Sequence, residues 1–477
     1  AQTPAARRRA AHTMTDSLEI LRDFMALLNS SEQLTVWIVG LLALGFFVFW
    51  VADPWRALLA WITTFSLQVG ASSFHLSVSD LFLVPLVAGA FISYLAHPKI
   101  IKPPTALLVF ALLFLTVGNL ATAFQLGELP QWTWLNKDLG LLALLAPYCA
   151  ILILCRDRAR TEKLLQMFLV SLSVVNLVGL LLYVFSIFAG VESRVNSAGM
   201  RFRGFLLDPN GYGGLIAVAA TFQFAILSMK PKRGLSSALQ VLNGCALVAG
   251  CALTLSRGGL IGLLSGGIAL LFFTRLKKSF SVALAGVGIA ACIFAMSSRQ
   301  DLLTAARART DDTGNIESRL DYMEEGVRMY FDSPLTMATG IGIGTFIHKS
   351  PRFFGDMHQI HNTYIWLLVE GGPVILMAYL LVLYRALRNS YWIWRRVPDL
   401  RYAGAGCFCG LISTIAWCMT VDGMYHHHVW ILLAFSELLY QHARAALSRT
   451  VPAVPALPAH LSLSGVGSHP TGALHPA

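Results

Sequence analysis

Long apolar runs separated by short polar connections dominate this chain. The runs follow one another from Leu34 to Tyr440, and many approach the roughly 20 residues that a helix needs to cross a bilayer. Of the 477 residues, 56% are hydrophobic and only 13% are charged. Because lipid offers no hydrogen-bond partner to an open backbone, such runs are expected to be helices. The sequence therefore predicts an all-α, polytopic transmembrane helical bundle and excludes a soluble enzyme.

Basic residues mark every second connection, and the positive-inside rule places those connections in the cytoplasm. The formal net charge of +11 therefore reports topology and does not indicate a nucleic-acid partner. The run from Trp55 to Val69 follows Asp53 and Pro54 and contains several polar residues, so we interpret it as a re-entrant or interfacial piece. About twelve spans then remain, with both termini cytoplasmic. The basic connections contain Lys99 and Lys102, Arg156 to Arg160, Lys230 to Arg233, Arg275 to Lys278, and Arg385 to Arg396.

This pattern divides the chain into five regions. The last region has few large apolar residues and is rich in Pro, Ala, Gly, Ser and His, which is typical of disorder. The regions are a basic cytoplasmic leader (1–33), transmembrane helices (34–296), a long, partly helical periplasmic loop (297–360), C-terminal transmembrane helices (361–445) and a disordered cytoplasmic tail (446–477).

Four arginines break the positive-inside trend. Arg194, Arg201 and Arg203 stand in an outer connection before an apolar run, and Arg257 lies in "TLSRGG", between two spans with almost no loop. An arginine near the bilayer centre costs roughly 2.5 to 3.5 kcal/mol on insertion scales. An anionic ligand would explain why these cations are kept there. The alternative is that they reach lipid phosphates or pair with Asp208.

The long outer loop contains a segment with helical spacing, "NIESRLDYMEEGVRMYF". Asn315 is a suitable N-cap, and a helix lying on the membrane surface would turn either Arg319 or Arg328 inward. The following glycine string, "GIGIGTF", lacks the lysine of a phosphate-binding loop and predicts turns only. The apolar stripe of the helix would consist of Leu320, Met323, Val327 and Tyr330.

His361 stands at the entrance of the span "HNTYIWLLVEGG". A histidine in that position is often an interfacial or capping residue, but this one shares its membrane face with the arginines. Neutral imidazole can accept a proton near pH 7, so His361 is the candidate general base, or else a residue that only orients a substrate or hydrogen-bonds it.

Several other polar residues at this face are weaker candidates for lining the same site. The histidines of "YHHHVW" point about 100° apart on a helix, so they do not converge on one metal ion. Glu370 is a carboxylate inside a span, and helix packing through Gly371 and Gly372 also accounts for its surroundings. The residues that could line the site are Asn210, Asn362, Glu370, Asp422 and His426.

The order of these motifs resembles the O-antigen ligase and O-antigen polymerase family of bacterial membrane proteins. The similarity runs from about Leu139 to Tyr440 and includes R-x-x-G followed by "DPN", then "SRGG", then a long outer loop ending "GIGIGTF…HNTYIWLLVEGG". In this resemblance Arg201 and Arg257 match the family's essential arginines, and His361 matches its loop histidine. Arg203 is an additional cation beside Arg201, which leaves open whether Arg201 or Arg203 contacts the ligand.

The resemblance implies an inverting, metal-independent glycosyltransferase of the inner membrane, with its active site facing the periplasm and no cofactor. The donor would be a glycan on undecaprenyl diphosphate, and the acceptor another glycan or lipid A-core. Arg201, Arg203, Arg257 and Arg319 would bind the diphosphate, because guanidinium groups bind phosphate oxygens in pairs. Other membrane proteins of surface polysaccharide assembly, such as those of lipopolysaccharide or exopolysaccharide, are possible partners.

Two other functional classes remain to be weighed against an enzyme. A flippase for lipid-linked oligosaccharides would be expected to carry ionisable groups near mid-membrane and internal repeats, whereas the notable charges here gather at one face. A non-catalytic scaffold would leave Arg257 without an anionic ligand. Within the enzyme class, the sequence does not separate a ligase from a polymerase.

Overall fold

The computed structural model describes residues 45, 47–67, 78–97, 103–189, 195–197, 201–206, 208–230, 235–274, 286–287 and 314–450, most of them helical. The helices of the N-terminal half are α3 (Pro54–Thr64), α4 (Val78–Ala96), α5 (Thr105–Leu113), α6 (Asn119–Leu126), α7 (Gln131–Thr133), α8 (Leu139–Leu154) and α9 (Arg158–Ala189). Those that follow are α10 (Pro209–Met229), α11 (Leu235–Leu253), α12 (Arg257–Leu271), α15 (Gly314–Tyr330), α16 (Pro334–Thr339), α17 (Thr345–Lys349), α18 (Pro351–Phe354), α19 (Thr363–Arg396), α20 (Arg401–Cys418) and α21 (His427–Thr450).

Short irregular elements join these helices. The π-helical segments Phe114–Gly118 and Trp134–Asp138 connect α5 to α6 and α7 to α8, and the 3-10 turns Pro398–Leu400 and Gly423–Tyr425 flank α20. The strands β1 (Asn196–Ser197) and β2 (Arg201–Phe202) form one antiparallel pair, a small exception to the predicted all-helical architecture.

Seven helical segments within the described ranges are long and apolar enough to cross a membrane. They include Thr105–Leu126, Gln131–Leu154 and Pro209–Met229, while Arg257–Leu271 is apolar but shorter. A helical, multi-pass membrane protein is thus confirmed. The count of about twelve spans stays a prediction, since most of the apolar runs Leu34–Ala52 and Val282–Met296 lies outside the described residues. The whole N-terminal leader and the tail from residue 451 also lie outside them. Helix α3 has only 11 residues and rises about 16 Å, too little to cross a bilayer alone.

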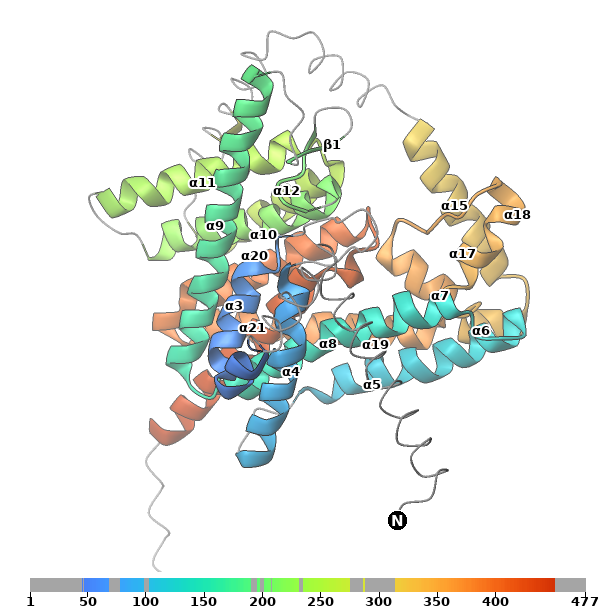
Figure 1. Ribbon diagram of the computed structural model, residues 1–477, viewed down its shortest axis with the longest axis horizontal. Coiled ribbons are helices and arrows are strands. Elements are labelled where there is room, and N and C mark those ends of the chain that lie inside the picture. Colours follow the sequence, from blue (N-terminus) through green and yellow to red (C-terminus); the bar gives the residue numbers. More distant parts are fainter. Residues whose placement is uncertain are drawn as a thin grey trace, which may run out of the picture.

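Helix α10 forms the centre of the bundle, packed against α11, α12 and α20 (Figure 1). Its sequence, PNGYGGLIAVAA, combines an N-terminal proline with small residues that allow close helix approach. A Cβ on Gly259 would lie 2.9 Å from the backbone of Gly213, so the crossing of α10 and α12 requires glycine at 259. This tight crossing sets the start of α12, and therefore Arg257, beside the start of α10.

The glycine string, Gly340 to Phe346, forms backbone hydrogen bonds with α19 at a kink in that helix. Pro373 has no N–H for the carbonyl of Val369, and Gly372 before it is left-handed, with φ 74°. The freed carbonyls of Val369 and Glu370 accept hydrogen bonds from the backbone N–H groups of Ile341 and Gly342, at 2.8 and 2.9 Å. The string predicted to form turns therefore replaces the hydrogen bonds that the kink removes.

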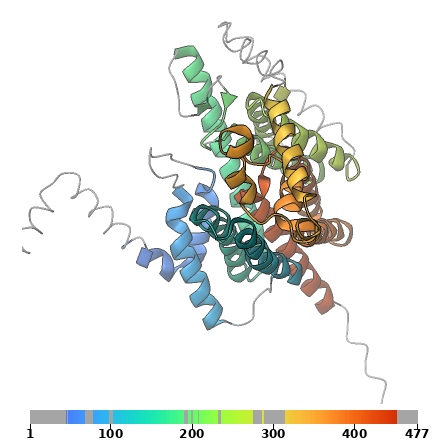
Figure 2. The same cartoon turned by 90° about the vertical axis from the view of Figure 1, so that its right-hand side faces the viewer.

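Helices α15 to α18 gather at one end of the molecule, next to α6 and α7 (Figure 1). Figure 2 faces that end and shows their yellow and orange segments in the foreground. Helix α15 begins at Gly314, so the prediction that Asn315 precedes the helix as its N-cap is wrong by a residue or more. In the predicted stripe, Tyr330 is buried and Met323 and Val327 pack on the core, whereas Leu320 is exposed.

Candidate functional site

A cavity of about 220 Å³ lies where α10, α12 and α19 begin and α20 ends. Each helix N-terminus directs free N–H groups and a partial positive charge outward, so three starting helices create a region that favours anions. The cavity is lined by Asn210, Arg257, Gly258, Ile261, Arg319, Leu320, Met323, His361, Met419, Thr420 and Val421. It therefore gathers four of the residues selected from the sequence, from four separate segments.

Arg257 is the first residue of α12 and reaches the cavity because the turn before it is tight. Leu255 has a left-handed conformation, with φ 51°, which reverses the chain between α11 and α12. Ser256 then caps α12, its side-chain oxygen accepting a hydrogen bond from the N–H of Gly259 at 3.1 Å. Glycine at 258 leaves room for the neighbouring chain, because a Cβ there would lie 2.0 Å from Thr420 Oγ1.

Arg201 supports the cavity wall from behind Asn210. Its Nη2 donates to Asn210 Oδ1 and its Nε donates to the carbonyl of Thr254, both at 2.9 Å. The carbonyl of Asn210 also accepts a hydrogen bond from Trp417 Nε1 at 3.0 Å. Arg203 follows on the far side of Phe202 and does not line the cavity. Of the two arginines, Arg201 is the one attached to the cavity.

Arg319 is the arginine of α15 that faces inward. It lines the cavity, and its Nη1 donates to the carbonyl of Thr420 at 3.0 Å, just beyond the end of α20. A cation in that position also stabilises the C-terminal end of a helix dipole. Arg328 instead pairs with Glu324 and Glu325 at the surface, with 69% of its side chain exposed.

His361 lies two residues before α19 and lines the same cavity as Arg257, the first residue of α12. Burial lowers the pKa of its imidazole, and the nearby Arg319 guanidinium lowers it further, while Asp422 and Asp208 oppose the shift. The folded-state pKa therefore lies below the ordinary value of about 6.5. At neutral pH the ring is uncharged and able to accept a proton.

Two of the weaker candidates have structural roles away from the cavity. The side chain of Asn362 caps α19, its Oδ1 accepting from the N–H groups of Tyr364 and Ile365. Glu370 accepts from the backbone N–H groups of Gly344 and Phe346, at 2.7 and 2.9 Å, and from Trp366 Nε1 at 2.6 Å. Its carboxylate thus fixes the glycine string against the α19 kink.

Asp422 and His426 line two neighbouring cavities. Asp422 contributes to one of about 460 Å³, together with Trp132, Asn136, Gln359 and Tyr425. His426 contributes to a smaller one beside Asp208, of about 100 Å³, and its ring packs edge-on against Trp417. Within the described ranges, no group of three or more His, Cys, Asp and Glu side chains is arranged to hold a metal ion.

The sequence analysis did not select Lys137, a buried cation in this region. Its Nζ lies 3.2 Å from Asp422 Oδ2 and 4.8 and 4.7 Å from the ring centroids of Trp366 and Tyr425. The continuous apolar run begins only at Leu139, although the helical segment starts at Gln131 and so includes Lys137. A lysine inside a span is costly and would have been the available signal.

Comparison with known proteins identifies one family. Residues 242–380 match the family model described as O-Antigen ligase, a range that contains Arg257, Arg319 and His361. Over this range the chain is similar to the O-antigen ligase family, which confirms the resemblance noted in the sequence for this part of the chain. Together with the apolar helices, the match supports a membrane protein of glycan ligation or polymerisation. No curated protein matches the chain.

Proposed function

We propose that this protein transfers a glycan from undecaprenyl diphosphate to a sugar hydroxyl on a second glycan or on lipid A-core, at the periplasmic face of the inner membrane. The observation that carries the proposal is the convergence of Arg257, Arg319 and His361 on one cavity at three helix N-termini. Cations and helix N-termini suit a diphosphate, and a neutral imidazole suits proton removal.

In this mechanism the diphosphate binds beside Arg257 and Arg319, with Arg201 holding Asn210 in place. The acceptor oxygen attacks the anomeric carbon, and the bond from that carbon to the diphosphate oxygen breaks. His361 takes the acceptor proton, and the lipid diphosphate leaves with the bonding electrons. The arginines stabilise the negative charge that develops on the leaving group. A single displacement of this kind inverts the anomeric configuration.

The adjoining cavity of about 460 Å³ suits the sugar portion of the reactants. Trp132 and Tyr425 offer aromatic faces there, and Asn136, Gln359 and Asp422 offer hydrogen-bonding groups for hydroxyls. Val421 and Asp422 are consecutive and line the two cavities, so the sugar and the diphosphate would lie next to each other.

A transfer assay distinguishes this function from the flippase alternative. Purified protein in detergent, without a sealed bilayer, is mixed with a lipid-linked glycan and either a second lipid-linked glycan or lipid A-core. We expect a new glycosidic product and release of undecaprenyl diphosphate, and the acceptor that reacts identifies polymerase or ligase. A flippase would give no product in detergent but would move the donor across vesicles, and that pair of results would contradict the proposal.

A further inference from the structure

A second, larger cavity lies at the opposite end of the central helices. Its volume is about 1050 Å³, and it is lined by Arg158, Glu162, Met229, Lys230, Phe273, Trp394, Arg395, Arg396, Pro398, Asp399, Arg401 and Tyr402. Helix α10 begins at the first cavity and ends at this one, and 21 residues rise about 31 Å. That separation is close to the thickness of a bilayer's hydrocarbon core, about 30 Å.

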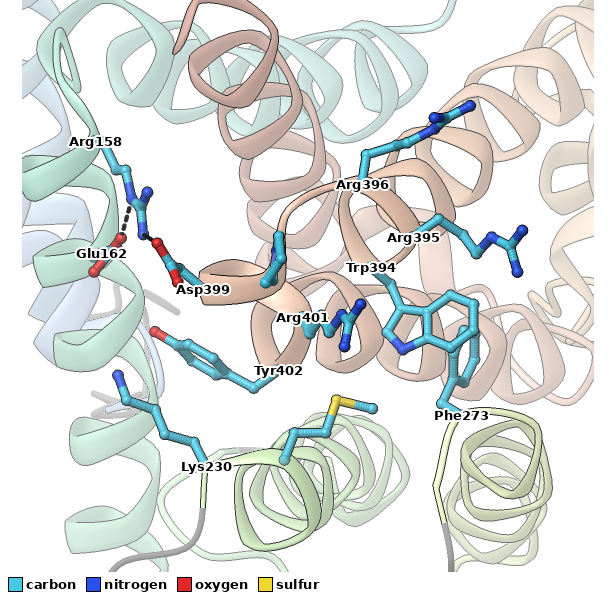
Figure 3. Close-up of a pocket in the computed structure, with 12 residues that line it drawn as sticks. Arg158, Glu162, Lys230, Phe273, Trp394, Arg395, Arg396, Asp399, Arg401 and Tyr402 are labelled. Atoms are coloured by element: carbon cyan, nitrogen blue, oxygen red, sulfur yellow. Dashed lines mark hydrogen bonds and ion pairs between the residues drawn. The ribbon is translucent and has the colours of Figure 1, made fainter. Parts of the chain in front are cut away.

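Cations in this cavity outnumber carboxylates by five to two. Figure 3 shows that both carboxylates lie beside Arg158: its guanidinium pairs with Glu162 and lies 3.9 Å from Asp399. Among the described residues, no carboxylate forms a salt bridge with Lys230, Arg395, Arg396 or Arg401. Arg395 and Arg396 end α19 and favour its helix dipole, but that role does not account for Lys230 and Arg401, which come from two other segments and line the same cavity.

The surroundings of the cavity are those of a membrane interface. Trp394 and Phe273 meet edge-on, with their ring centroids 4.7 Å apart. The Nζ of Lys230 lies 4.6 Å from the ring centroid of Tyr402. Next to Phe273, the end of α12 presents Phe272 with 82% of its surface exposed. Aromatic side chains of this kind collect at the level of lipid headgroups, and an exposed apolar helix end suits acyl chains.

We propose that this basic cavity binds the phosphate-bearing headgroup of an anionic phospholipid, with Lys230, Arg395, Arg396 and Arg401 around the phosphate and the acyl chains beside α12. Basic pockets between the ends of membrane helices suit such headgroups, because guanidinium groups bind phosphate oxygens in pairs. A soluble phosphate compound has the same chemistry but would not use the exposed apolar surface beside the cavity.

Native mass spectrometry of the purified full-length protein tests the proposal, with added cardiolipin, phosphatidylglycerol, phosphatidylcholine or glycerol phosphate as probes. We expect retention of the two anionic lipids in preference to phosphatidylcholine. The double variant Arg396→Gln, Arg401→Gln should bind them about tenfold or more weakly, and Arg396→Lys, Arg401→Lys should recover part of the binding. These side chains are exposed, and the thermal unfolding midpoint of each variant verifies folding.

The matched control is Lys163→Gln, Arg444→Gln, which removes two exposed cations outside the cavity, one on α9 and one on α21. Its lipid binding should stay within about twofold of wild type. Equal losses in the two double variants, or no preference over phosphatidylcholine, would overturn the proposal. Glycerol phosphate that binds as tightly as the lipids and displaces them would overturn the lipid assignment and identify a soluble phosphate as the ligand.

Discussion

Arg257 and Arg328 provide a direct comparison of two arginines at the same end of the molecule. Arg257 lines the cavity at the start of α12, whereas Arg328 pairs with surface carboxylates on α15. We expect Arg257→Ala to abolish glycan transfer in cells and Arg257→Lys to impair it strongly, because an ammonium group does not reproduce two parallel hydrogen bonds. Each lost charge-assisted contact is worth about 1.5 to 3 kcal/mol. Polymer length and amount on gels give the measurement. Arg328→Ala should resemble wild type, and normal polymer from Arg257→Ala would exclude Arg257 as a ligand of the diphosphate.

Arg319 should control the pH at which His361 works. Burial and the Arg319 charge both lower the pKa of His361 from its ordinary value of about 6.5. The neutral form of the imidazole therefore dominates at neutral pH. The single-turnover rate should therefore be flat near neutral pH and fall as pH drops through that pKa. Arg319→Gln removes one cause of the lowering, so the acid limb should move to higher pH. If the rate of Arg319→Gln falls at the same pH as that of wild type, or if the wild-type rate does not change with pH, His361 is not the base.

At the scale of elements, the crossing of α10 and α12 positions Arg257, and its glycines can be tested in pairs. Gly259→Ala would place a Cβ 2.9 Å from the Gly213 backbone, which has no side chain to move aside, whereas a Cβ on Gly267 of the same helix meets nothing within 4 Å. Overpacking typically costs about 1 to 3 kcal/mol. Thermal unfolding in detergent should show a lower midpoint for Gly259→Ala and an unchanged or higher one for Gly267→Ala, since alanine favours helix. Similar midpoints would mean that the crossing tolerates a wider approach.

The sequence predicted helix existence better than helix irregularity. Apolar length predicted membrane helices, and charge alternation with the family resemblance selected Arg257 and His361. Helical spacing left either Arg319 or Arg328 facing inward, and the structure brings Arg319 to the cavity of the other two. The π-helical segment that carries Lys137 has no such signal, because one extra residue per turn leaves the composition unchanged. Glu370 and Asn362 could not be assigned either: each binds backbone N–H groups, which look the same at every residue.

For the whole molecule, transfer should proceed without a divalent cation. Arginines and three helix N-termini supply positive charge where the diphosphate would bind, which is the role that a metal ion plays in many other glycosyltransferases. Purified protein in lipid should therefore process the donor at the same rate in excess chelator as in magnesium. Activity that disappears with chelator and returns with magnesium or manganese would assign the leaving group's stabilisation to a metal.

The most direct test of the central claim separates donor binding by Arg257 from proton removal by His361. Donor affinity and single-turnover rate are measured together for wild type, Arg257→Ala and His361→Asn. Arg257→Ala should weaken donor binding at least tenfold. His361→Asn should bind the donor almost normally, but its single-turnover rate should fall by a factor of about 10² to 10⁴, the usual contribution of a general base. A His361→Asn protein with near-normal rate, or an Arg257→Ala protein with unchanged donor affinity, would contradict the account.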